Sequence, residues 1–383
     1  MRSTGDTPPN DPPDDPPAAN GTGTGTGTAS GTGDNADAGT DIAVGIVSDD
    51  GLAAARVGGA VEERDRVRTV VGTVPLNSDG DLDLAGAGER MRREEGWSRL
   101  IYVTDLPLTA EHRPVVRQAR PDGSVAVVSL PALGVLGVSR RLRRQLAALH
   151  AFAEEAEDDS ETTTDTGDDG EGSDDELAAT HVLRGPLARL RLLAGMIRCN
   201  RPATLLRALT GCLAAVAATG GFGIFYGSIW QMAHSIPPWR LALTALVSVA
   251  VLCGWLVFHN GMWHRGGRVS PWRRRLDNLS TLGTVGLATC AIYLAAVAMM
   301  LFLAVVVVPP DYLAEQISAP VGPTTYLAIA WFAACLGTMG GALGSNFDRD
   351  VTIRSATYSK REYARRVRSG YYDEDDGSQP ARG

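Results

Sequence analysis

The 383-residue sequence has almost no lysine and lacks the short motifs that mark the common enzyme classes. Lys360 is the only lysine among 36 basic side chains, so the others are arginines. The chain contains no glycine-rich phosphate loop, no GxSxG nucleophile turn and no HExxH metal-binding helix. Its five cysteines include no CxxC pair, which indicates packing residues rather than metal ligands or disulfides. The sequence therefore predicts no catalytic residue, no metal and no cofactor.

Charged side chains are also missing from four long stretches of the second half. An α-helix needs about 20 mostly apolar residues to cross the hydrocarbon core of a bilayer, and each stretch is long enough. The uncharged stretches are residues 208–239, 241–264, 278–310 and 316–347. Within residues 204–346 they predict an all-α four-helix transmembrane bundle, with helices at about 208–230, 239–258, 281–308 and 324–345.

The loops between these stretches predict the orientation of the bundle. The loop before the third stretch carries five arginines, whereas the loop before the fourth has only Asp311 and Glu315. Seven basic residues also lie between Arg349 and Arg368. Because basic loops stay on the cytoplasmic side, we expect residues 347–383 to form a cytosolic tail. Both termini are then cytoplasmic, and the protein is a multi-pass protein of the plasma membrane.

Composition divides the first half into a tail, a domain and a linker. Residues 1–40 combine proline pairs with a Gly-Thr alternation, which predicts a disordered tail without the apolar run of a signal peptide. In residues 41–156, short β-branched runs alternate with helical patterns and predict a cytosolic α/β domain. The expected strands are 42–47, 67–76, 100–103 and 125–130, and the expected helices are 51–67, 82–95 and 139–156. Residues 154–176 hold thirteen acidic and no basic side chains, so we expect 157–180 to be a self-repelling linker.

A basic segment follows the linker. In residues 181–203, arginines interleave with leucines, which on a helix places a cationic stripe beside an apolar one. Such a helix lies in the headgroup region of an anionic inner leaflet, although an ordinary juxtamembrane flank has the same composition. We therefore expect lipids as partners. The predicted membrane-interface residues are Arg184, Arg189, Arg191, Arg198, Arg201, Arg273, Arg274, Arg275, Trp263 and Trp272.

Three polar residues follow or end predicted strands. They are Thr104, Asp105 and Ser129, and open α/β sheets bind their ligands at the carboxyl ends of the strands. This pattern predicts a ligand-binding edge. The alternative is that Asp105 and Pro107 form a turn and that Ser129 caps the segment after it.

Glycines recur at four-residue spacing in the apolar stretches. GxxxG pairs allow close helix contact, either inside one bundle or between copies of the chain. A homo-oligomer is therefore an open alternative to packing within one chain. The predicted helix-packing pairs are Gly223 with Gly227, Gly337 with Gly341, and Gly340 with Gly344.

Several motifs resemble those of a family of actinobacterial four-span membrane proteins. They are TDLP at 104–107, SLPALG at 129–134, GMIRCNRP at 195–202, LDN at 276–278 and GGALGS at 340–345. The resemblance implies this two-part architecture for residues 41–365. Some such proteins carry the name methylene-tetrahydrofolate dehydrogenase. This sequence gives that activity no support, since it has no nicotinamide-binding glycine turn and its soluble domain has no lysine.

The soluble domain also resembles the strand pattern of archaemetzincin-like metalloproteases over about 50 residues. In that pattern a strand ending in Thr-Asp precedes a strand closing in Ser-Leu, and the zinc helix follows. The corresponding helix here, Arg140 to Phe152, contains His150 but no HExxH arrangement. Zinc chemistry is therefore not carried over to this chain.

Three functions remain open at this point. The leading hypothesis is a non-enzymatic, membrane-anchored binding or scaffold module with an unknown protein partner or small ligand and no nucleic acid. The second is a small-solute permease or passive pore, oligomeric through the glycine faces. The third is a degenerate metalloprotease-like enzyme.

Overall fold

The computed structural model describes residues 44–61, 67–76, 82–110, 113–162, 179–185, 187–264 and 271–368. The first half of the chain forms a domain around a mixed β-sheet, and the second half is helical, with three helices long and apolar enough to span a membrane. The tail predicted over residues 1–40 lies outside the described residues, as does most of the linker predicted over 157–180.

The centre of the sheet consists of four parallel strands. These are β1 (Val44–Ser48), β2 (Val67–Val71), β3 (Arg99–Thr104) and β6 (Val125–Ser129), in the order β2-β1-β3-β6. Every residue of β1, β3 and β6 is buried. Parallel strands covered on both faces have such continuous apolar sequences, and the four strands predicted from the sequence are these four.

Three antiparallel strands extend the sheet beyond β6 and were not predicted. They are β4 (Leu108–Ala110), β5 (Arg113–Ala119) and β7 (Ala179–Val182), with β5 between β6 and the other two. β7 begins inside the segment that we expected to be linker. Its four residues have no strand signal of their own, and it forms because β5 offers an edge to pair with.

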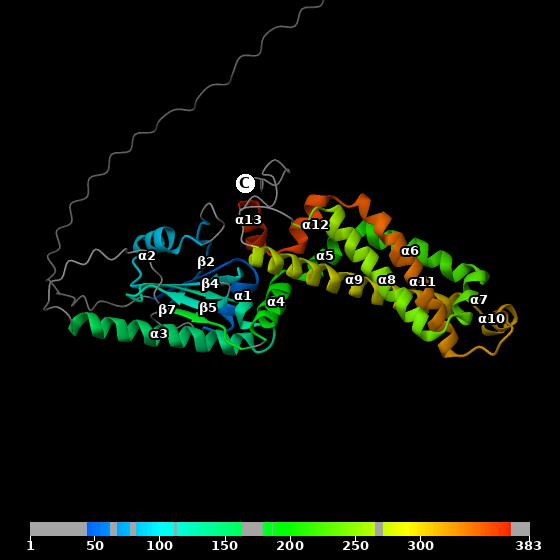
Figure 1. The fold of residues 1–383 in the computed structure, drawn as a ribbon, viewed down its shortest axis with the longest axis horizontal. Helices are drawn as coiled ribbons and strands as arrows, with labels where there is room; N and C mark the ends of the chain where they lie inside the picture. The colour runs from blue at the N-terminus through cyan, green and yellow to red at the C-terminus, as the bar shows by residue number, and fades with distance from the viewer. Residues whose placement is uncertain are drawn as a thin grey trace, which may run out of the picture. The chain divides into compact units, whose positions relative to one another are not determined.

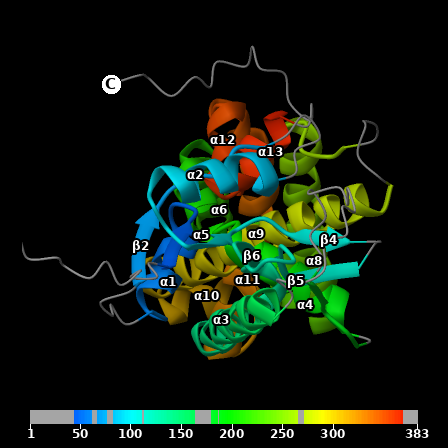
Figure 2. The ribbon, with the colours of Figure 1, turned by 90° about the vertical axis from the view of Figure 1, so that its left-hand side faces the viewer.

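Helices cover both faces of the sheet. The helices α1 (Leu52–Gly58) and α3 (Val138–Thr162) pack on one face, and η1 (Leu84–Gly88) and α2 (Glu89–Glu94) cover the other. Figures 1 and 2 show α3 and α2 on opposite sides of the strands. The helix α3 continues six residues beyond the predicted end at 156.

Three long helices dominate the second half. They are α8 (Pro238–His259), α9 (Pro271–Val307) and α11 (Pro323–Gly344), close to three of the predicted spans. The first predicted span is broken at Tyr226 into α6 (Thr210–Phe225) and α7 (Gly227–Ser235). With 16 residues, α6 is about 24 Å long, shorter than a hydrocarbon core of about 30 Å. A short helix, α10 (Pro310–Ile317), precedes α11 and pairs with α7 through a hydrogen bond from Gln231 Nε2 to Gln316 O of 2.9 Å.

The predicted glycines lie mostly in one contact, between α6 and α11. A Cβ atom added to Gly337 would lie 2.6 Å from Val216 O, and one on Gly223 would lie 2.9 Å from Ala333 Cβ. The other α11 glycines also face α6, where Gly340 meets Thr219, Gly341 meets Val216 and Gly344 meets Ala215. The exception is Gly227, which belongs to α7 and faces Gln316. The close approach is therefore intramolecular, which removes the observation that motivated an oligomeric pore.

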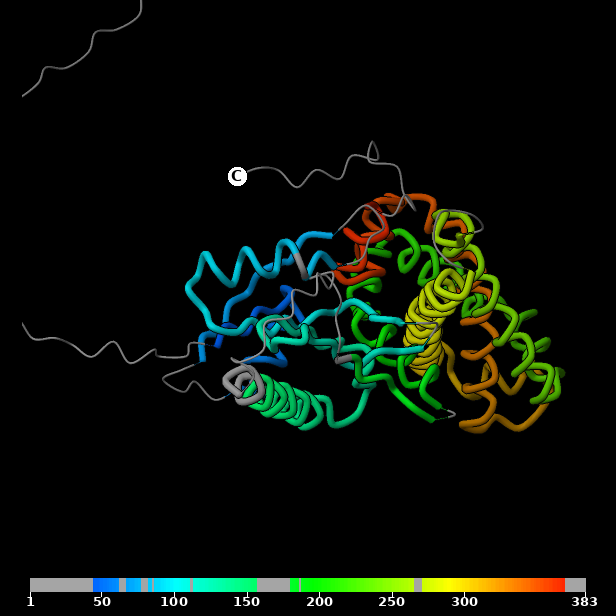
Figure 3. Tube along the Cα trace, turned by 60° about the vertical axis from the view of Figure 1, so that its left-hand side comes forward, coloured from blue at the N-terminus to red at the C-terminus, as the bar shows by residue number. Residues whose placement is uncertain are grey.

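Short helices connect the two halves. They are α4 (Ala188–Cys199) and α5 (Pro202–Ala208) before the bundle, and η3 (Ser345–Phe347), α12 (Asp350–Thr357) and α13 (Lys360–Arg368) after it. Asp348 caps α6, accepting hydrogen bonds from Gly211 N at 2.8 Å and Cys212 N at 3.1 Å. The segment predicted as a tail is therefore folded as far as Arg368, and Figure 3 shows α12 and α13 at the red end of the trace.

Candidate functional site

The structure brings two predicted edge residues, Thr104 and Asp105, together around Asp49, and the third, Ser129, joins them through the backbone of Leu106. Thr104 Oγ1 donates to Asp49 Oδ2 at 2.7 Å, and Asp105 N donates to the same oxygen at 2.9 Å. Ser129 Oγ donates to Leu106 O at 2.9 Å. All of these side chains are buried, so the carboxyl edge of the parallel sheet is a connected polar cluster.

This edge is closed by the C-terminal helix α13. Arg361 Nε lies 3.3 Å from Asp49 Oδ1, and its guanidinium also donates to Val74 O. The remaining bond to Asp49 Oδ1 comes from the hydroxyl of Tyr102. We expected a ligand at Thr104, Asp105 and Ser129, and this stays a prediction. The structure does show where the hydroxyls of Thr104 and Ser129 donate. Their hydrogen bonds are used inside the chain, because an arginine distant in sequence occupies the place where open α/β sheets hold ligands.

A second group of buried charges joins α13 to the first turns of α9. Arg365 Nη2 lies 3.1 Å from Asp277 Oδ2 and 2.6 Å from Glu362 Oε1, and Arg366 Nε lies 2.8 Å from Glu362 Oε1. The Arg366 guanidinium stacks 4.0 Å above the Tyr358 ring. We call Asp277, Glu362, Arg365 and Arg366 the buried ion cluster, and it contains two positive and two negative side chains. Burial by itself raises the pKa of Glu362, but the two arginines outweigh it and hold that pKa at about 2.

The helix α4 packs on the sheet domain rather than presenting its whole apolar stripe to lipid. Arg198 NH1 donates to Gly134 O at 2.9 Å, and Arg191 NH2 donates to Leu133 O at 3.3 Å. A Cβ on Gly195 would collide with Pro131 O, so only glycine allows α4 to approach this turn. The stripe residues Leu192, Met196 and Cys199 belong to the core of the sheet domain. Arg191 and Arg198, predicted as membrane-interface residues, thus contact backbone carbonyls of the sheet domain.

The other predicted interface residues lie around the same junction. Arg201 has a left-handed backbone (φ 51°), and its guanidinium would lie 2.6 Å from a Cβ on Gly51, itself at φ 101°. Arg273 NH2 lies 3.4 Å from Pro107 O. Trp263 packs on the helical core, and Trp272 packs on the sheet core. The first turns of α9 also contain Arg274 and Arg275, and Arg184 and Arg189 are exposed near the start of α4.

One carboxyl oxygen in the polar cluster has no hydrogen-bond partner among the described residues. It is Asp105 Oδ1, and the residue is 4 % exposed. Burial, followed by repulsion from Asp49, raises the pKa of Asp105 to about 7, against the opposing effect of Arg201 and Arg198. Near neutral pH this carboxyl therefore changes its charge inside the junction.

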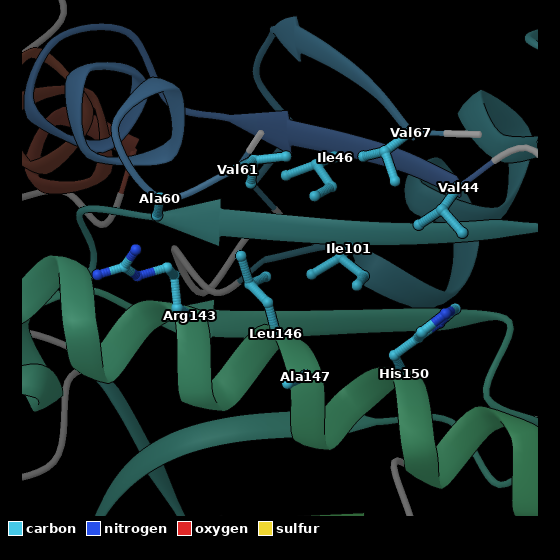
Figure 4. A pocket seen from close by; sticks show the side chains of 10 residues that line it. All are labelled: Val44, Ile46, Ala60, Val61, Val67, Ile101, Arg143, Leu146, Ala147 and His150. Atoms are coloured by element: carbon cyan, nitrogen blue, oxygen red, sulfur yellow. The ribbon is translucent and has the colours of Figure 1, made fainter. Parts of the chain in front are cut away.

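An open cleft remains on the α3 face of the sheet. It has a volume of about 390 Å³, and its walls are apolar side chains of β1, β2, β3 and α3 together with the residues that follow α1. Figure 4 shows Leu146 of α3 pointing toward the strands between Arg143 and His150. These two polar residues stand two helical turns apart at the rim, about 10 Å along α3. His150 Nδ1 lies 3.4 Å from Arg99 NH1.

No comparison with protein-family models, curated proteins or solved structures gives a match for this chain. Among the described residues, no three histidine, cysteine, aspartate or glutamate side chains lie together as a metal site would require. The site is therefore interpreted from its geometry alone.

Sequence reasoning missed the residues on which the junction depends most. Asp49 lies two residues after the strand predicted over 42–47, and Asp277 is the one acid in an arginine-rich loop, so both had a recognisable signal. The spacing of Glu362, Arg365 and Arg366 places all three on one helical face. It does not reveal that this face is buried, because burial requires the partner helix α9.

Replacing Arg365 with methionine is expected to destabilise the folded protein by about 3–5 kcal/mol, because it leaves Asp277 and Glu362 buried with one arginine. Adding Asp277→Asn restores a neutral cluster and should recover part of the loss. Thermal unfolding of the full chain in detergent micelles measures both effects. The control is Lys360→Met on the same helix, since Lys360 forms an exposed pair with Asp50 and should change the midpoint little. Equal midpoints for Arg365→Met and the wild type would refute the role of the cluster.

Asp105→Asn is expected to remove a pH dependence of stability. In the folded protein the pKa is about 7, against an ordinary 3.8, so between these values the folded state holds one more proton than the unfolded state. Between these two pKa values the free energy of unfolding therefore falls as pH rises, by about 1.4 kcal/mol per pH unit. The fall levels off above pH 7, where the folded protein has also lost the proton. Unfolding midpoints of wild type and variant at pH 5, 6.5 and 8 test this, with Asp311→Asn as an exposed-acid control. A difference in unfolding midpoint between Asp105→Asn and wild type that stays constant from pH 5 to pH 8 would contradict the raised pKa of Asp105.

Proposed function

We propose that this protein is a multi-pass membrane protein whose α/β domain is a cytosolic binding module, docked firmly on the inner ends of the membrane helices. The observation that carries the proposal is the double use of α13. Arg361 of this helix pairs with Asp49 at the sheet edge, and Arg365, about one turn later, pairs with Asp277 near the start of α9. A domain held in this way stays at a fixed place beside the bilayer.

Four crossings and cytoplasmic termini are part of the proposal. Three helices have the length and apolarity of spans, and α6 meets the α4–α5 segment at a bend of 61°. The contact of α6 with α11 favours α6 as the fourth crossing, completed by the residues next to it. The basic side chains at the start of α9 and in α13 favour the cytoplasm for this end of the bundle.

Reporter fusions are expected to locate the two ends of the bundle on opposite sides of the membrane. A reporter that is active only in the cytoplasm should be active after Arg368 and inactive when inserted between Asp311 and Glu315. A reporter that requires export should give the reverse pattern. Matching signals at the two positions would refute four crossings with cytoplasmic termini.

The same docking also points to where the module binds its ligand. The carboxyl edge of the sheet is filled by Arg361, whereas the cleft beside α3 is open and has an apolar lining. Ligand pockets are typically apolar with a few polar groups that orient the ligand. Arg143 at the rim supplies a positive charge, so the ligand class is a small apolar molecule with an acidic group. The motifs that resemble those of the actinobacterial four-span family lie mainly at the docked junction, and membership of that family is part of this proposal.

Octanoate is expected to bind the full chain in nanodiscs more tightly than octanol does, since only the acid pairs with Arg143. Arg143→Gln should weaken octanoate binding about tenfold and leave octanol unchanged. Leu146→Trp fills the cleft and should abolish both. Calorimetric titration with empty nanodiscs as blank measures these affinities.

The matched control is Arg144→Gln, which removes the same charge from the neighbouring α3 residue, outside the cleft lining. It should bind octanoate like the wild type. Undiminished octanoate binding by a folded Leu146→Trp variant would remove the cleft as the binding site.

A further inference from the structure

Three arginines line a second hollow, at the start of α4. Its volume is about 410 Å³, and it lies between β5, β7 and the first turn of α4. The arginines are Arg113, Arg184 and Arg189, and the lining includes no acidic side chain. In the described part of the chain, none of the three forms an ion pair with an acidic side chain. Three arginines that line one hollow, without an acidic partner among the described residues, favour an anion.

The backbone adds to this preference. The N-cap residue of α4 is Leu187, which has no side-chain acceptor for the first N–H groups of the helix. The N-terminus of a 12-residue helix carries a partial positive charge. Its first N–H group, on Ala188, donates to Gly185 O at 3.2 Å, and the N–H groups that follow belong to the same positive end. Helix and arginines therefore present one positive surface to the hollow.

The position of the hollow relative to α9 indicates which anion reaches it. The Arg189 guanidinium lies 6.0 Å from the Trp272 ring, in the first turn of α9. Further along α9, Leu279 is the first half-exposed apolar side chain, and it lies seven residues, or about 10 Å, from Trp272. Lipid phosphates lie just outside the hydrocarbon core, at this depth, and tryptophan is common there.

Exposed apolar side chains beside the hollow also fit a position at the membrane surface. Leu187 and Leu190 are 66 % and 60 % exposed in the first turn of α4. They flank Arg189, so the turn combines apolar side chains with a positive charge, as membrane-surface segments do.

We infer that this hollow binds the phosphate of an anionic lipid headgroup from the leaflet next to the sheet domain. The inference rests on the proposed docking of the domain beside the membrane, but not on the ligand of the cleft. Arg113, Arg184 and Arg189 hold the phosphate oxygens, the α4 N–H groups face them, and Leu187 and Leu190 contact the glycerol and acyl region. Zwitterionic lipids fit less well because they bring a positive group to the same place.

The test uses the full chain in detergent micelles with dioctanoyl phosphatidylglycerol, dioctanoyl phosphatidylcholine or inorganic phosphate, and native mass spectrometry to count bound molecules. The wild type should retain phosphatidylglycerol in preference to phosphatidylcholine. Arg184→Gln/Arg189→Gln should weaken phosphatidylglycerol binding about 30-fold. The control Arg140→Gln/Arg144→Gln makes the same charge change on exposed residues of α3 and should bind like the wild type.

Three outcomes would overturn the inference. Equal losses in both double variants would show a general charge effect, and equal retention of the two lipids would remove headgroup selectivity. Displacement of the lipid by inorganic phosphate at equal concentration would make free phosphate the ligand. If the double variant unfolds early, Arg184→Lys is used instead, which keeps the charge but loses the forked geometry and should bind with intermediate affinity. Octanoate binding in the cleft is measured separately, so failure here leaves the proposed function standing.

Discussion

The buried ion cluster is the constraint on which the arrangement of this protein depends. Two arginines and two acids lie almost without solvent contact where α13 meets α9. Such a cluster adds little to the free energy of unfolding compared with well-packed apolar residues. Removing the partner of one member is strongly destabilising, because it leaves an unpaired buried charge. The cluster therefore fixes α13 on α9, and Arg361 of the same helix pairs with Asp49 of the sheet domain. Together the two contacts favour a single docked arrangement over a domain that moves freely on a tether.

This docking decides which surfaces of the sheet domain are available. With Arg361 in the carboxyl edge, the usual ligand position of a parallel sheet is closed, and the α3 cleft stays open on one face. The hollow at the start of α4 lies at the junction with α9. The proposed cytosolic ligand and the proposed lipid thus meet the same domain at separate places.

The sequence predicted the parallel strands well, because runs such as Val44–Ser48 are apolar throughout and leave few alternatives. It predicted the long helices α8, α9 and α11 for the same reason. It did not predict β5 and β7, whose residues alternate weakly. They form strands by pairing, β5 with β4, β6 and β7, and β7 with β5. In the candidate site, the sequence placed three polar residues at the carboxyl edge of the parallel strands, where they lie in the structure: Thr104, Asp105 and Ser129. Their role was not foreseen, since Arg361 lies more than 230 residues away along the chain.

The sequence by itself determined the division into an α/β domain and a helical half with membrane-length helices, because both follow from local runs of apolar residues. Only the tertiary structure decided that α4 packs on the sheet, that the α11 glycines serve one intramolecular contact with α6, and that α13 is buried. A charged helix such as Lys360–Arg368 is predicted to be exposed when it is considered alone. It becomes part of the interior because Arg361 pairs with Asp49, just after β1, and Arg365 pairs with Asp277 of α9. Such pairing depends on contacts between residues distant in sequence.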